Sequence, residues 1–64
     1  MKYLIDNSPH IDAKYRSNDG KTFIITDLPQ KENDPWVVFE NVKTKDSYNC
    51  RLEAFLARYS PLPD

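Results

Sequence analysis

Glycine is almost absent from this chain, and the position of the only one, Gly20, constrains the fold more than any other feature. It ends the run Ser-Asn-Asp-Gly at residues 17–20, a cluster of turn formers whose last member accepts positive φ freely. Residues 21–27 are rich in β-branched and aromatic side chains, which are typical of strands. Asp-Gly between such flanks predicts a β-hairpin that joins residues 13–16 to residues 21–27.

Two more segments have the composition of strands, residues 36–40 and residues 47–50, with a turn between them at residues 41–46. Residues 28–35 carry a proline near each end and follow neither strand nor helix periodicity, so we expect a long loop there. Four strands joined by turns predict an antiparallel meander.

The periodicity changes near the end of the chain. Leu52, Phe55, Leu56 and Tyr59 are spaced as one face of a helix, which predicts a helix over residues 51–59. A helix of about two turns is not stable alone in water, so this one must pack on the sheet through that face.

These elements predict one domain over residues 13–60, mainly β with one short C-terminal helix, built as a small antiparallel barrel of four to five strands. Residues 1–12 are expected to form an N-terminal arm or an edge strand, and residues 61–64 an extended tail. Sixty-four residues leave no room for a second domain.

Charge and cysteine content exclude several classes of protein. The net charge is −1 and there is no polybasic block, so the usual signature of nonspecific nucleic-acid binding is missing. No apolar run is long enough to cross a bilayer, and the first residues do not resemble a signal peptide. The single cysteine, Cys50, allows no disulfide within the chain. We therefore expect a cytoplasmic protein.

A series of residues follows the predicted elements: a Tyr-Arg pair, an Asp-Gly turn, a Val-Val-Phe strand, a Tyr…Cys stretch and a closing Leu…Phe…Tyr helix, at Tyr15, Arg16, Asp19, Gly20, Val37, Val38, Phe39, Tyr48, Cys50, Leu52, Phe55 and Tyr59. Over about residues 13–60 this series resembles short domain families of unknown function from enterobacterial phages and prophages. Arg51 replaces the proline usual before the leucine, the spacing from cysteine to phenylalanine is shorter, and the loop at residues 28–35 is longer. The resemblance implies an SH3-like small β-barrel of phage origin and brings no catalytic residues.

Candidate catalytic groups are few. His10 has only Asp12 nearby in sequence, and a general base needs both an orienting partner and a nucleophile. Cys50 precedes the predicted helix and Arg51, which could lower the pKa of a thiol, but a lone cysteine is more often a buried structural residue. Structural zinc needs four nitrogen or sulfur ligands and the chain offers two. We predict no enzyme, no metal and no cofactor, with a reactive Cys50 as the alternative.

Recognition of a partner is the function that these exclusions favour. The predicted loop is acidic and adjoins aromatic side chains, and small barrels bind peptides through such surfaces. We predict a non-catalytic binding module, an accessory protein of a phage or prophage that engages a host or phage protein through Trp36, Asp34, Glu32 and Tyr48. Aromatic residues that face outward could also form a homodimer contact.

Binding of nucleic acid is the alternative function. Residues 41–60 are mildly basic, and Lys43, Lys45, Arg51 and Arg58 could contact phosphates while Tyr48 stacks on a base.

Overall fold

The structure is a computed structural model that describes residues 9–62. Within that range the chain forms six strands and one helix: β1 (Lys14–Ser17), β2 (Thr22–Asp27), β3 (Gln30–Lys31), β4 (Asp34–Asn41), β5 (Ser47–Arg51), α1 (Leu52–Arg58) and β6 (Tyr59–Pro61). The predicted class, mainly β with one short C-terminal helix, is confirmed. The described residues contain more strands than the four to five predicted. β3 forms where a loop was expected, and β6 forms where the end of the helix and the start of the tail were expected.

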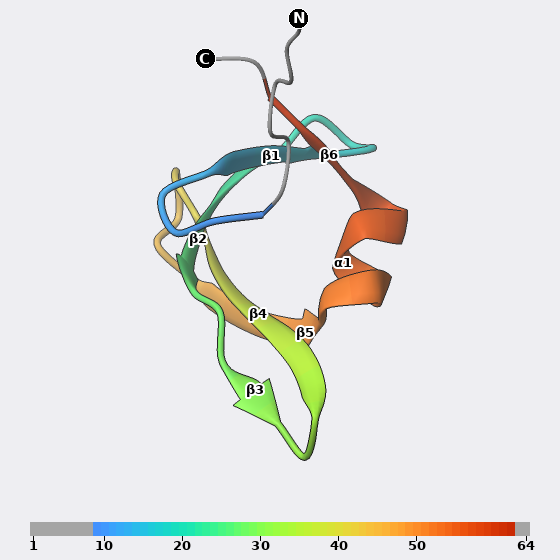
Figure 1. Cartoon of the computed structure of the whole chain (residues 1–64). Coiled ribbons are helices and arrows are strands. Elements are labelled where there is room, and N and C mark those ends of the chain that lie inside the picture. Colours follow the sequence, from blue (N-terminus) through green and yellow to red (C-terminus); the bar gives the residue numbers. More distant parts are fainter. Residues whose placement is uncertain (1–8, 63–64) are drawn as a thin grey trace, which may run out of the picture.

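The strands form one strongly curved antiparallel sheet (Figure 1). β1 pairs with β2, β2 with β4, and β4 with β5, as expected for a meander. β6 returns to pair with the other edge of β1, and β3 extends the sheet beside the first residues of β4. β5 and β6 are therefore the two outer strands of the curved sheet, and α1 connects the end of one to the start of the other.

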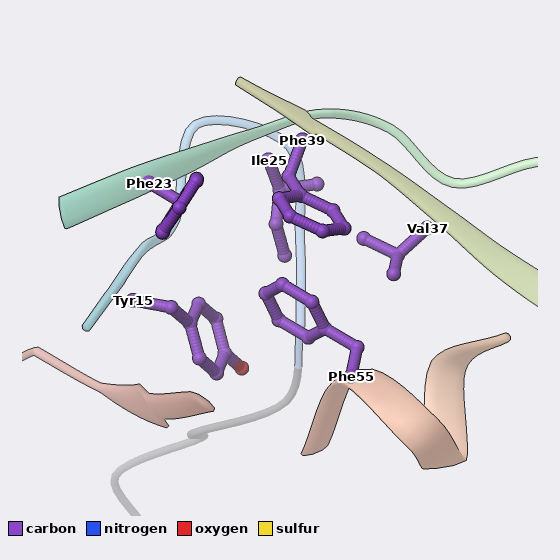
Figure 2. Packing of buried hydrophobic residues seen from close by; sticks show 6 residues of the cluster. All are labelled: Tyr15, Phe23, Ile25, Val37, Phe39 and Phe55. Atoms are coloured by element: carbon purple, nitrogen blue, oxygen red, sulfur yellow. The ribbon is translucent and has the colours of Figure 1, made fainter. Parts of the chain in front are cut away.

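The core lies on the concave face of the sheet, where side chains from three strands meet α1 (Figure 2). Alternate residues of each strand point inward, as the period of two requires. In β4, for example, Val37 and Phe39 are buried while Trp36, Val38 and Glu40 on the opposite face are only half-buried. The complete buried hydrophobic set among the described residues is Tyr15, Phe23, Ile25, Val37, Phe39 and Phe55.

The hairpin predicted around Gly20 is present. Gly20 has φ +87°, and its N–H donates to the carbonyl oxygen of Ser17 at 3.0 Å. A Cβ at this position would meet nothing within 4 Å, so the requirement for glycine comes from the backbone conformation alone.

The prediction of a long loop at residues 28–35 is wrong, because most of this segment forms a β-hairpin. Lys31 of β3 lies opposite Asp34 of β4, and the two residues between them, Glu32 and Asn33, have φ of 50° and 68°. Positive φ at both central residues gives the tight turn that matches the twist of paired strands. Asparagine tolerates this conformation but glutamate seldom adopts it, so the sequence signal for the turn is weak.

The helix is shorter than the predicted residues 51–59. Tyr59 already has strand dihedrals, φ −123° and ψ 147°, and Pro61 pairs with Tyr15 of β1 instead of beginning a free tail. Leu62 follows with its N–H donating to the carbonyl oxygen of Lys14, while residues 63–64 lie outside the described range. Leu56, expected on the packed face, is 45% exposed, because a helix of seven residues turns only Phe55 fully inward.

Only residues 9–12 of the predicted N-terminal arm fall within the described range. They make a turn that leads into β1, in which the N–H of Ala13 donates to the carbonyl oxygen of His10. The N–H of Asp12 donates to the carbonyl oxygen of Ile25 at 2.8 Å. This end of the arm is thus tied to β2 without being a strand, and the prediction for residues 1–8 lies outside the described residues.

Candidate functional site

Trp36 lies on the convex face of the sheet, outside the core. Its neighbours in sequence, Pro35 and Val37, point to the other side, and Val37 is fully buried. Across the strands Trp36 lies opposite Arg51 of β5. The backbone N–H of Trp36 donates to the carbonyl oxygen of Pro29 at 2.8 Å. The largest side chain in the molecule is therefore held on the outside by a backbone that is paired on both edges.

Three residues lie beside this tryptophan on the same face, and together with it they form what we call the hairpin surface: Lys31, Asp34, Trp36 and Arg51. The Nζ of Lys31 lies 4.8 Å from the centroid of the Trp36 ring, within the range of a cation–π contact. A nitrogen of the Arg51 guanidinium lies 3.9 Å from a carboxylate oxygen of Asp34. The surface stands where the β3–β4 hairpin extends away from the body of the sheet (Figure 1).

Asp34 and Arg51 also line a small surface pocket of about 110 Å³, together with Pro35 and Glu53. Asp34 and Arg51 form an ion pair with each other, and both side chains are more than half exposed. An ion pair of that kind contributes only about 0–1 kcal/mol to stability, so it can open to admit another charged group. The hairpin surface therefore offers an aromatic ring beside charges of both signs.

The four residues predicted to bind a protein partner do not all meet. Trp36 and Asp34 belong to the hairpin surface, and Glu32 lies in the turn at its tip. Tyr48 lies opposite Phe39, which places it on the concave face, and its ring stacks on that of Phe39 with the centroids 5.7 Å apart. It is 44% exposed at an end of the core, on the other face of the sheet from Trp36.

The basic residues of the nucleic-acid alternative are also dispersed. Lys43 and Lys45 lie in the turn before β5, whereas Arg51 is the last residue of that strand. A strand rises about 3.3 Å per residue, so the two lysines lie well over 10 Å from Arg51. Arg51 is paired with Asp34, and Arg58 ends α1. The geometry thus gives no continuous basic track from these four residues.

Cys50 is half-buried on the concave face, opposite Val37, and packs against the core. Burial raises the pKa of its thiol, and the nearby Arg58 charge opposes that shift only in part. His10 lies in the exposed turn before β1. Among residues 9–62 there is no group of three or more His, Cys, Asp or Glu side chains that could hold a metal ion.

The sequence analysis missed the role of Lys31 beside Trp36, and assigned Arg51 to another surface. The signal that could have found them is the spacing. If residues 32 and 33 form a two-residue turn, Lys31 must lie on the same face as residues 34 and 36. Recognising that turn requires accepting glutamate at a position with positive φ.

Comparison of the chain with models of known protein families, with curated proteins and with solved structures finds no match. The helix within the described range is too short and too polar to cross a membrane.

Proposed function

We propose that this protein is a non-catalytic binding module that engages a protein partner through the hairpin surface. The observation that carries the proposal is the position of Trp36, which a register enforced by the buried Val37 and Phe39 keeps on the convex face. A chain with so few large apolar residues would gain stability by burying its only tryptophan in the core. Tryptophan and arginine are also the residues that most often dominate binding energy in protein interfaces.

The turn that supports this surface gives a second argument. Glu32 has φ 50°, a left-handed conformation that costs a residue with a side chain roughly 1 kcal/mol or more. Strained backbone of this kind tends to occur where a side chain is needed for function. A carboxylate at the tip of the hairpin, next to Lys31 and Asp34, would give the partner a polar contact at the rim of the tryptophan.

The other parts of the proposal rest on the sequence. We propose that the partner is a host or phage protein and that the chain is an accessory protein of a phage or prophage, because residues 13–60 resemble such families. A cytoplasmic location is supported by the lone Cys50, since small secreted domains usually depend on disulfides. The raised pKa of that thiol supports a structural role for it over a nucleophilic one.

The test combines capture with a direct optical measurement. Proteins captured from a bacterial lysate are identified, purified and titrated against this chain while the emission of Trp36, the only tryptophan, is recorded. We expect the emission to shift on binding. Trp36→Ala lacks this signal, so its affinity and that of the wild type are compared by isothermal titration calorimetry, and we expect the variant to bind at least tenfold more weakly, as for a central interface residue.

Two arginines provide a matched control. Arg51→Ala removes a member of the hairpin surface and should weaken binding, whereas Arg58→Ala removes the same side chain from the end of α1 and should not. Tyr48→Ala tests the remaining predicted residue, and we expect binding to survive it because Tyr48 lies on the opposite face. A partner that binds Trp36→Ala as tightly as the wild type would contradict the proposed site.

A further inference from the structure

Within residues 9–62, one edge of β5 pairs with no other strand. The N–H of Asn41 donates to the carbonyl oxygen of Asp46 at 2.9 Å, which fixes the alternation of the β4–β5 ladder. In that register Tyr48 and Cys50, opposite Phe39 and Val37, exchange hydrogen bonds with β4.

The alternate residues of β5 must then direct their backbone groups away from β4. These are Ser47, Asn49 and Arg51, and all three are exposed. Within residues 9–62 the backbone groups of Ser47 and Asn49 bond to no other segment, whereas the carbonyl oxygen of Arg51, the N-cap residue of α1, accepts the first hydrogen bond of that helix. This edge of β5 therefore presents a row of N–H donors and carbonyl acceptors that another strand could pair with.

The opposite end of the sheet is protected from such pairing. On the outer edge of β6 the N–H of Tyr59 donates to the carbonyl oxygen of Phe55, and Pro61 has no N–H. β3 has only two residues. By contrast, Ser47–Arg51 contains no proline, lysine or bulge, features that usually protect an edge strand, and its one charged side chain, Arg51, is at its end.

The sequence of this edge is complementary to itself. We propose that β5 pairs antiparallel with β5 of a second copy of this chain, about a two-fold axis at Asn49. Asn49 then lies opposite Asn49 of the other copy and exchanges two hydrogen bonds with it. Ser47 lies opposite Arg51, and the N–H of Arg51 donates to the carbonyl oxygen of Ser47 of the other copy. No pair of like charges is opposed, and on the concave face Tyr48 lies beside Cys50 of the other copy.

This pairing would join the two sheets into one and place both hairpin surfaces on the same convex face, because Trp36 and Arg51 are cross-strand neighbours there. The dimer would thus present two binding surfaces to one partner or to two adjacent sites, which increases the apparent affinity. The inference does not depend on the proposed function, since self-association can be measured without any partner.

The experiment is sedimentation equilibrium on the purified chain from about 10 µM to about 1 mM, because a single strand pair buries less surface than a standard interface. We expect the average mass to rise with concentration from 7.5 kDa toward twice that value, and to stop there. A wild-type chain that stays monomeric at the highest concentration, or that forms larger species, overturns the proposal.

Charge variants at the axis test the register. Asn49→Lys and Asn49→Asp each place two like charges opposite each other, so each chain alone should be monomeric across this range, and an equimolar mixture of the two should associate again. Asn18→Lys adds the same charge in the exposed turn between β1 and β2 and should associate like the wild type. Association of Asn49→Lys at the wild-type level, or no recovery in the mixture, would overturn the proposal.

A variant of the backbone tests the proposed contact without changing any side chain. Chemical synthesis with an N-methyl group on Asn49 deletes one outward donor and leaves the hydrogen bonds of β5 to β4 in place. We expect this chain to give the wild-type circular dichroism spectrum and to lose at least tenfold in dimer affinity. Unchanged self-association of the methylated chain would show that this edge is not the contact.

Discussion

Phe55 is the side chain that attaches α1 to the sheet. It is fully buried, and its ring centroid lies 4.7 Å from that of Tyr15 and 4.9 Å from that of Phe39 (Figure 2). Tyr59, the first residue after the helix, adds a third ring at 4.7 Å. One residue thus connects β1, β4 and the start of β6, and the helix has no other fully buried side chain.

Truncation of this ring should therefore be severe. We expect Phe55→Ala, and likewise Phe39→Ala, to lower the free energy of unfolding by about 3–5 kcal/mol, the usual effect of removing a buried phenylalanine. A domain of this size has only about 3–10 kcal/mol in total, so much of either variant should be unfolded at room temperature. Urea denaturation followed by circular dichroism measures the difference.

Leu56→Ala is the matched control for that measurement. Leu56 follows Phe55 in the same helix but is 45% exposed, so we expect its truncation to cost less than about 1 kcal/mol. Equal losses for the two helix variants would mean that the helix packs through a different face.

The β3–β4 hairpin is the element whose stability is most open to improvement. Its turn holds Glu32 and Asn33 at positive φ, and asparagine reaches that conformation at lower cost than glutamate. We expect Glu32→Asn to raise the free energy of unfolding by about 0.5–1 kcal/mol. Thermal denaturation measures this change.

The same variant separates stability from function. If the Glu32 carboxylate contacts the partner, Glu32→Asn should be more stable than the wild type and bind more weakly in the tryptophan titration. A gain in stability with unchanged affinity would assign the turn to folding only.

Elements that are marked by one residue type, or by the spacing of apolar residues along the chain, could be predicted from the sequence. Elements that depend on how strands pair with one another could not. Gly20 located the first hairpin, and the spacing of Leu52 and Phe55 located the helix. Tyr59 fits the helical spacing equally well but is drawn into β6 by pairing with β1, a tertiary contact that local pattern does not contain.

The candidate site shows the same limit. Trp36 was identified by residue type, but grouping it with Tyr48 requires knowing which face of the sheet each occupies. That depends on the number of residues in the turn between β4 and β5, whose type the sequence did not reveal. The turn is organised by Asn41, whose side-chain oxygen accepts hydrogen bonds from the N–H groups of Lys43 and Thr44.

For the whole molecule, the phenols of Tyr15 and Tyr59 and the thiol of Cys50 predict a loss of stability in alkali. Burial raises the pKa of Tyr15 and Tyr59 above the ordinary value of 10.0, and that of Cys50 above 9.0. A group whose pKa is raised by folding stabilises the folded state at pH values below its ordinary pKa, and this contribution disappears as the pH rises through the folded value. We expect the free energy of unfolding to fall as the pH passes 9 and 10.

Tyr15→Phe checks the origin of that fall, since it keeps the ring in the core and removes the ionisable group. Urea denaturation midpoints at pH 7 and at several values above pH 9 should decline less steeply for this variant than for the wild type. Parallel curves for the two chains would show that Tyr15 does not contribute.

The alternation of residues along β4 limits the insertions and deletions that the chain can accept. Its residues alternate between the core and the convex face, so one residue gained or lost inside Asp34–Asn41 would exchange the two sets, exposing Phe39 and turning the indole inward. Insertions and deletions should therefore be tolerated at the tips of the turns on either side of β4, and should prevent folding when they fall within β4. Homologous chains, aligned on this strand, should keep its length even where little else is shared.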